Sequence, residues 1–281
     1  VVATVDRRAS HDVLELAGCD QVLNLGDMLG ADLARRVLLP SGRHQVIGQI
    51  GDLCIAEAAA PPQRVGSPPA DSGLRQRTGL SVAGLWARGE LTVGRPETVL
   101  RAGATLILAG SADQLARYDE LYGSTEDVDE DHAVVILGGG RVGRATGRAL
   151  DAAGRPFRIV ELDPGKVRDP DDYVVGDAAD LEVLHDAGIR RAPAVIVTTH
   201  DDDTNVYLTL YCRRLRPDVQ IVARARLDRN VSTLHRAGAD SVLSYAATGA
   251  TSLWNAVDTG ATVQIAEGLD GVGAQVEPLP D

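Results

Sequence analysis

The sequence predicts an α/β protein, with a doubly wound parallel sheet and a small α+β lobe arranged as a tandem repeat. Two observations predict the sheet: strands and helices alternate over residues 133–258, and a glycine-rich turn follows the first of these strands. A third observation predicts the repeat, because residues 1–38 align with residues 221–258 without a gap.

The chain begins with two strand–helix pairs. We expect strands at 1–5 and 21–25, which are rich in valine and leucine, and helices at about 9–17 and 28–38, which carry spaced apolar residues. We interpret residues 1–39 as the C-terminal part of a first large lobe whose front half is missing from this sequence.

Residues 45–122 show a different pattern, with short strands and few long helices, and predict the small α+β lobe. Strands are expected at 55–57, 82–86 and 105–109, and helices at 70–79 and 111–122. The acidic stretch 123–132 is interpreted as a solvated linker in preference to a metal site.

Residues 133–258 form the second large lobe, in which strands and helices alternate. Helices should start near Gly143, Asp180, Asp202, Arg229 and Ala246. Strands are expected at 133–137, 157–161, 173–175, 194–198, 220–225 and 241–244. Residues 259–281 fall where a second small lobe would start, or form a tail.

The internal alignment contains ten identical positions, among them Ala17-Gly18 with Ala237-Gly238 and Val22-Leu23 with Val242-Leu243. Both copies therefore predict the same order of strand, helix, strand and helix. The repeating unit is one large lobe followed by one small lobe.

A glycine turn follows the strand that ends at Leu137, with the spacing Gly138-x-Gly140-x-x-Gly143. In a Rossmann-like turn the first glycine allows the bend, and the second lets the backbone approach a pyrophosphate. The third lets the helix pack on the strand, and the helix N-terminus faces the phosphates. The spacing alone is weak evidence, so the surrounding residues have to support it.

Ligands of a doubly wound sheet lie at the ends of the first and fourth strands, which here places Thr198 and Thr199 opposite the glycine turn. Glu161 ends the second strand, at the position where an acid binds ribose hydroxyls, and Asp163 is the alternative acid. A carboxylate there repels a 2′-phosphate, which favours NAD(H) or an adenosine nucleotide over NADP.

Arg141 and Asp177 leave alternatives open. Arg141 either pairs with a phosphate or is a solvated arginine of the loop. Asp177 either accepts a hydrogen bond from an adenine amino group or caps the helix that begins at Asp180.

The run His200-Asp-Asp-Asp203 stands at the start of a predicted helix. Acids at such a position interact with the positive end of the helix, which we favour over a metal site. His200 would be a proton relay only if the chain were a dehydrogenase.

The formal charge of −12 argues against a nucleic-acid-binding protein, because such proteins usually carry a basic face. No apolar run approaches the ~18 residues that a membrane-spanning helix requires.

Several motifs together resemble the N-lobe of RCK (KTN) domains, also called TrkA-N: Gly138-x-Gly-Arg-Val-Gly143, Glu161, Val175-Gly-Asp-Ala178, Thr198-Thr-His-Asp-Asp-Asp-Thr-Asn205, Ile221-Val-Ala-Arg224 and Ala237-Gly-Ala-Asp240. Residues 46–122 resemble the RCK C-lobe, or TrkA-C, through Gly66, Leu74-Arg-Gln-Arg-Thr-Gly79 and Leu106-Ile-Leu-Ala-Gly110. Domains of this family regulate potassium channels and Trk-type potassium uptake systems.

The resemblance implies a regulatory module on the cytoplasmic side of the cell membrane, which binds NAD(H) or ATP/ADP. Its partner would be a potassium channel pore or a Trk-type membrane subunit, and its lobes would form homo-oligomers. It implies neither a catalytic residue nor a metal. The nucleotide-binding residues that it implies are Gly138, Gly140, Arg141, Val142, Gly143, Glu161, Asp177, Ala178, Thr198, Thr199 and Arg224.

Within that set, the resemblance matches Arg141 to an arginine that contacts phosphate, Glu161 to the acid that binds ribose and Asp177 to a contact on the adenine side. Arg224 matches a recurring arginine of the fifth strand, where the first copy has Thr4. We therefore expect the site of the first copy to be different or degenerate.

Two other functions remain open at this point. An NAD-dependent oxidoreductase would need acid or base residues in the small lobe, where only Asp71, Glu90 and Glu97 are candidates. A structural ring subunit would keep the same fold with an empty crevice.

Overall fold

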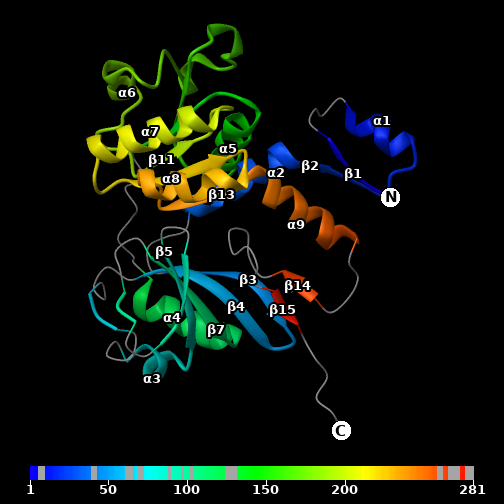
Figure 1. Ribbon diagram of the computed structural model, residues 1–281, viewed down its shortest axis with the longest axis vertical. Helices are drawn as coiled ribbons and strands as arrows, with labels where there is room; N and C mark the ends of the chain where they lie inside the picture. The colour runs from blue at the N-terminus through cyan, green and yellow to red at the C-terminus, as the bar shows by residue number, and fades with distance from the viewer. Residues whose placement is uncertain are drawn as a thin grey trace. The chain divides into compact units, whose positions relative to one another are not determined.

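The computed structural model forms two compact units, drawn in Figure 1. The first unit comprises residues 1–38 and 129–259, and the second comprises residues 39–128 and 260–281. The residues that the structure describes are 1–5, 10–38, 43–60, 66–68, 73–87, 90–95, 98–100, 104–123, 132–257, 262–264 and 273–275.

A six-stranded parallel sheet organises the first unit, in the order β10-β9-β8-β11-β12-β13. The strand order reverses between β8 and β11, which confirms the doubly wound α/β fold. Its strands are β8 (Val134–Leu137), β9 (Phe157–Glu161), β10 (Tyr173–Val175), β11 (Ala194–Val197), β12 (Gln220–Ala225) and β13 (Ser241–Ser244). All six agree with the predicted strands to within a residue.

Helices cover both faces of this sheet. On one face α6 (Leu181–Asp186), α7 (Asp202–Leu215) and α8 (Val231–Ala237) bury leucines against the strands, among them Leu184, Leu208 and Leu234. On the other face α5 (Arg141–Ala152) contributes Val142 and Leu150. The segment between β9 and β10 contains two 3₁₀ turns, at Pro164–Lys166 and Pro170–Asp172.

The first 38 residues form β1 (Val2–Val5), α1 (His11–Leu16), β2 (Gln21–Asn24) and α2 (Leu25–Leu38). At an offset of 220 residues, β2 has the same bounds as β13, and α2 starts where α9 (Tyr245–Val257) starts. The repeat seen in the sequence is therefore repeated in structure. The limits proposed for the domains stay a prediction.

The two corresponding helices exchange places within the first unit. Helix α2 packs on α5 and contacts β12 and β13, and it adds Leu29 and Leu33 to the core on that face. Helix α9 contacts β13, which it directly follows, and also β1 and β2, the parallel pair beside which it runs in Figure 1.

The second unit contains an antiparallel sheet in the order β3-β4-β7-β5-β6. Strands β4 (Leu53–Ala59), β5 (Ser81–Ala87) and β7 (Thr105–Gly110) were predicted, as were α3 (Leu74–Thr78) and α4 (Ala112–Tyr122). Strands β3 (His44–Ile50) and β6 (Glu90–Val93) were not, because β3 carries a register shift and polar residues and β6 is short.

Local chemistry explains both helices of the second unit. Gly79 ends α3 with a positive φ of 81°, the left-handed conformation that glycine adopts without strain. Ser111 and Gln114 form a capping box at the start of α4.

Beyond that sheet, β14 (Thr262–Gln264) pairs with β15 (Gly273–Gln275). Most of the acidic linker, at 124–131, lies outside the described residues, as do Asp71 and Glu97.

Gly30 allows the close packing of α2 on α5. A Cβ atom at this glycine would lie 2.4 Å from the Cβ of Ala145 and 2.8 Å from the backbone nitrogen of Thr146. Gly30→Ala should therefore lower the free energy of unfolding by about 1–3 kcal/mol in chemical denaturation, as overpacking does. Gly26→Ala, one turn earlier, meets only ordinary contacts and is the matched control; an equal loss in both variants would contradict this packing.

Because His235 is buried, we expect the stability of the protein to depend on pH. Its ring is 3% exposed, Nδ1 lies 3.0 Å from the carbonyl oxygen of Ala239, and Nε2 has no partner among the described residues. Burial lowers the pKa of His235 below 6.5, although the Ala239 carbonyl and Asp240 oppose this. Near pH 6.5, His235 therefore binds a proton in the unfolded chain more readily than in the folded chain.

Stability should accordingly fall as the pH drops below about 6.5, by about 1.4 kcal/mol for each unit by which the pKa is lowered. Urea denaturation between pH 7.5 and 5 checks this. His235→Leu should flatten the slope, and the exposed His200→Gln should retain it. A slope that is the same in the wild type and in His235→Leu would exclude His235 as its source.

Candidate functional site

A cavity of about 340 Å³ opens at the carboxyl ends of the parallel strands in the first unit. This volume is within the range of small-molecule sites. Ten of the predicted site residues line it, and Gly143 does not: Gly138, Gly140, Arg141, Val142, Glu161, Asp177, Ala178, Thr198, Thr199 and Arg224.

The three glycines of the turn act in three different ways. Gly138 has a φ of 104°, which an L side chain rarely adopts, and it makes the bend. Gly143 is buried, and a Cβ there would lie 2.0 Å from the Gly138 oxygen, so it allows α5 to pack on the turn. Gly140 has open space within 4 Å of its Cβ direction.

The open space at Gly140 shows whether a phosphate group could approach the backbone there. The N-terminus of α5 begins directly after Gly140, and its backbone N–H groups can bind an anion. A pyrophosphate can approach the backbone at Gly140 only where no side chain fills the space. The turn therefore fits a phosphate group.

Glu161 connects the end of β9 to the glycine turn. Its carboxylate accepts hydrogen bonds from the backbone nitrogens of Gly139 and Asp163, each at 2.9 Å, and lies 3.7 Å from Lys166 Nζ. The side chain is 7% exposed, so it is not the exposed strand end that an ordinary surface acid would be. These contacts fix the position of the carboxylate at the cavity wall.

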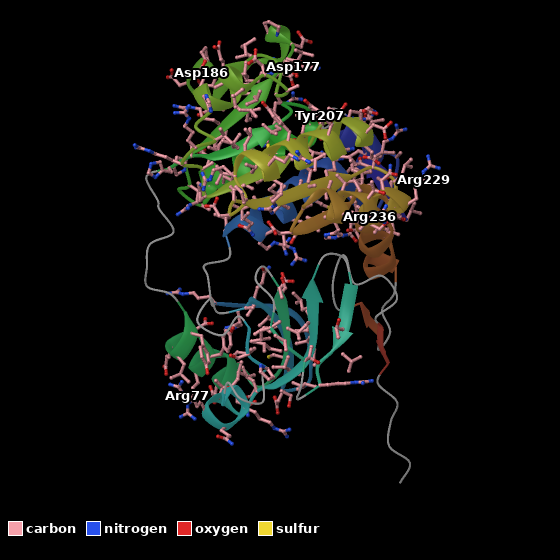
Figure 2. The ribbon with its side chains drawn as sticks, turned by 60° about the vertical axis from the view of Figure 1, so that its left-hand side comes forward. Arg77, Asp177, Asp186, Tyr207, Arg229 and Arg236 are labelled. Carbon is pink, nitrogen blue, oxygen red and sulfur yellow. The ribbon has the colours of Figure 1, made fainter. Side chains whose placement is uncertain are left out.

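Arg141 is exposed to solvent, as the simpler of its two interpretations expects, whereas Asp177 differs from the simpler of its own. Arg141 is exposed and is the first residue of α5, so it belongs to the helix and not to the loop. Asp177 does not cap α6, because Asp180 does so by accepting from the nitrogen of Glu182. Asp177, which is labelled in Figure 2, instead accepts from the nitrogen of Ala179 and is exposed. It is one of the residues that line the cavity.

Asn205 holds the β11 and β12 walls together and is fully buried. Its amide donates to the carbonyl oxygens of Thr199 and Arg224, and its Oδ1 accepts from Thr199 Oγ1 at 2.6 Å. On the other side, Thr198 Oγ1 donates to the Gly138 oxygen at 2.9 Å. These bonds fix the distance between the glycine turn and the strands opposite it.

The acids that follow β11 are engaged by the protein itself. Asp201 caps α7 by accepting from the nitrogen of Thr204, and this bond lowers the pKa of Asp201. Asp202 accepts from the nitrogens of Arg226 and Leu227 and from the amide of Asn230. Asp201 therefore serves the start of the helix, as expected, whereas Asp202 joins the helix to the segment that follows β12.

Arg224 and Tyr245 form the far wall of the cavity. The Arg224 guanidinium carbon lies 5.1 Å from the centroid of the Tyr245 ring, and the residue is 8% exposed. Burial lowers the pKa of Arg224, and Arg141 contributes in the same direction. This wall is therefore positively charged and desolvated.

Sequence reasoning missed further residues of the wall. Tyr245 directly follows β13, so the rule that ligands lie at the ends of parallel strands could have identified it. Gly26 belongs to α2 and reaches the cavity only because α2 packs on α5, for which the local sequence carries no signal. The others are Val160, Leu162, Lys166, Gly176, Asp201, Thr204 and Leu208. His200, which the sequence places beside Thr198 and Thr199 at the same strand end, also lines the cavity.

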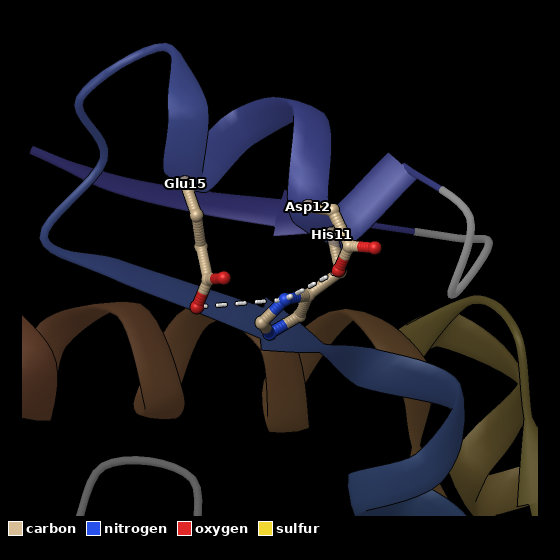
Figure 3. Close-up of side chains that lie close together, drawn as sticks. All are labelled: His11, Asp12 and Glu15. Carbon is tan, nitrogen blue, oxygen red and sulfur yellow. Dashed lines mark ion pairs between the residues drawn. The ribbon is translucent and has the colours of Figure 1, made fainter.

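One further group of possible metal ligands occurs among the described residues: His11, Asp12 and Glu15, in Figure 3. Their ligand atoms lie within 4.8 Å of one another, and His11 Nδ1 is 3.6 Å from Glu15 and 3.9 Å from Asp12. All three lie on the six-residue helix α1 and face solvent at least in part. Ion pairing explains the group, and we assign no metal to it.

Two domain families match the chain in sequence. The TrkA-C domain matches residues 64–123, and the TrkA-N domain matches residues 134–245. The crystal structure of the GsuK RCK domain covers 90% of this chain at 39% identity with a TM-score of 0.67. The chain belongs to the RCK family of TrkA-N and TrkA-C domains.

The names of other similar proteins refer to potassium channels or potassium uptake. "Probable potassium channel protein 2" of Methanocaldococcus jannaschii is 32% identical over 148 residues, which are 50% of this chain and 43% of that protein. "Trk system potassium uptake protein TrkA homolog" of Pyrococcus horikoshii is 31% identical over 96 residues, or 32% of this chain and 42% of that protein.

Solved structures of GsuK include ligands. The GsuK channel bound to NAD is 40% identical with a TM-score of 0.65, and GsuK bound to ADP is 27% identical with a TM-score of 0.55. Each covers 90% of this chain, which corresponds to 46% and 44% of those chains. This RCK chain thus spans about half of the length of the proteins that it matches, or less.

The glycines of the turn provide a matched pair of variants. Gly143→Ala would force a Cβ against the Gly138 oxygen and should lower the unfolding free energy by about 3 kcal/mol or more. Gly140→Ala projects into open space and should change it by less than about 0.5 kcal/mol. Chemical denaturation measures both, and a stable Gly143→Ala variant would contradict the close packing of α5 on the turn.

Proposed function

We propose that this chain is a nucleotide-binding regulatory module, which controls potassium transport through a membrane channel or a Trk-type transporter. The single observation that supports it most is the cavity between Gly140, Glu161 and Thr198, where a phosphate site and a buried ribose-type acid share one strand edge. The structures of GsuK bound to NAD and to ADP support NAD(H) or ATP/ADP as the ligand.

Each part of the nucleotide has a place in the proposed site. The phosphates would lie at Gly138, Gly140 and Arg141, where the N-terminus of α5 adds its positive end. The ribose would contact Glu161, and the adenine would lie toward Asp177 and Ala178 beside β10. Thr198 and Thr199 would border the phosphates from the β11 side.

Regulation then requires a difference in affinity between two arrangements of the domains. A ligand that binds one arrangement more tightly shifts the equilibrium toward it, and a coupling of about 1–3 kcal/mol is typical. The nucleotide would be bound without being turned over, as expected for a relative of channel and uptake proteins. No residue is assigned a catalytic role.

The partner in this proposal is a potassium channel pore or a Trk-type membrane subunit, with the module on the cytoplasmic side. None of the helices in the described parts of the chain is both long and apolar enough to cross a membrane. The names of the relatives support the partner, and homo-oligomers formed through the lobes are part of the same proposal.

Thermal unfolding in the presence of ligands tests the nucleotide site. At 100 times its dissociation constant, NAD(H), ATP or ADP should stabilise the protein by about 2.7 kcal/mol and raise its Tm. Gly140→Asp should retain the Tm of the ligand-free protein, because its side chain has room, but abolish the shift, because its charge repels phosphate.

Two results would count against this function. No Tm shift with any of these nucleotides at millimolar concentration would contradict nucleotide binding. Steady oxidation of NADH with a carbonyl substrate would instead favour the NAD-dependent oxidoreductase.

A further inference from the structure

The Arg224 side chain is a buried cation that has no anionic partner at ion-pair distance among the residues that the structure describes. It makes no ion pair among the described residues, and its buried Nε has no hydrogen-bond partner there. Its contact with the Tyr245 ring offers only part of what water would supply. A charge in this position is costly unless a ligand compensates it.

Asp202 compensates the charge of Arg224 only in part, because it acts electrostatically and makes no ion pair with it. Asp202 accepts three hydrogen bonds from Arg226, Leu227 and Asn230, and Asp201 accepts from the backbone and hydroxyl groups of Thr204. A second cation, Arg141, faces the same cavity and repels Arg224 electrostatically. An anion from outside the protein would complete the compensation of the two arginines.

The sheet places this cation beyond the phosphates and away from the adenosine. Arg224 lies on β12, two strands from β8, and so about 10 Å from the strand that carries the glycine turn. Glu161 and Asp177 lie on the opposite side of that turn, after β9 and β10. A ligand whose ribose contacts Glu161 thus extends from the turn toward Arg224.

We propose that Arg224, supported by the face of Tyr245, is a specificity-determining subsite for the terminal phosphate of a nucleoside triphosphate. The inference rests on the proposed function, because it concerns the far end of the same nucleotide site. A third phosphate brings negative charge to a buried guanidinium, which forms strong charge-assisted hydrogen bonds. The oxidised nicotinamide ring of NAD⁺ instead carries a positive charge toward it.

Isothermal titration of the whole chain with ATP, ADP and NAD⁺, in EDTA, tests this subsite. The wild type should bind ATP at least about tenfold more tightly than ADP, as expected for one added charge-assisted hydrogen bond. Arg224→Met should weaken ATP binding by about tenfold or more and leave ADP binding within about threefold. Arg224→Lys, which keeps the charge, should retain part of the preference.

The Tm of the ligand-free protein separates this role from a structural one. If Arg224 is an uncompensated cation that waits for a ligand, Arg224→Met should unfold at the same temperature as the wild type or higher. If the ring contact with Tyr245 is purely structural, the variant should unfold at a lower temperature, and the subsite is then overturned.

An unchanged ratio of ATP to ADP affinity in Arg224→Met also overturns the subsite, while the nucleotide-binding function stands. If the wild type binds NAD⁺ more tightly than ATP, the subsite is likewise overturned and the nucleotide-binding function stands. If the wild type binds none of these three nucleotides, the proposed function itself fails.

Discussion

The contact between Gly143 and the Gly138 carbonyl is the constraint on which the cavity depends. It holds the first turn of α5 against the end of β8, and Thr198 joins the same point by donating to the Gly138 oxygen. Two consecutive elements, β8 and α5, therefore meet the end of β11, which lies more distant in sequence, at a single point. The N-terminus of α5, the backbone at Gly140 and the end of β11 are placed by this one contact.

Other walls of the cavity are attached to that point by hydrogen bonds. Glu161 links β9 to the turn through Gly139, and Asn205 links the end of β11 to β12. Because both residues are buried, water cannot readily replace these bonds. Arg224, at the end of this series, makes no ion pair within the part of the chain that the structure describes.

The fold and much of the cavity wall could be predicted because their signals are local. Val134–Leu137 and the turn after it combine an apolar strand with glycines, and parallel strands bring their ends to a common edge. Gly26 could not be predicted, since its position results from the packing of α2 on an element more than a hundred residues away. Strand β3 was missed because its polar residues and its bulge hide the period of a strand.

The exchange of α2 and α9 between the two copies has a consequence for assembly. Exchange of an identical element normally joins two separate molecules, and dilution then releases them. Here both copies belong to one polypeptide, so each helix packs on the other copy within the same molecule. The connecting chain sets the effective concentration of this contact. The exchange is thus intramolecular, and its formation does not depend on the concentration of the protein in a cell.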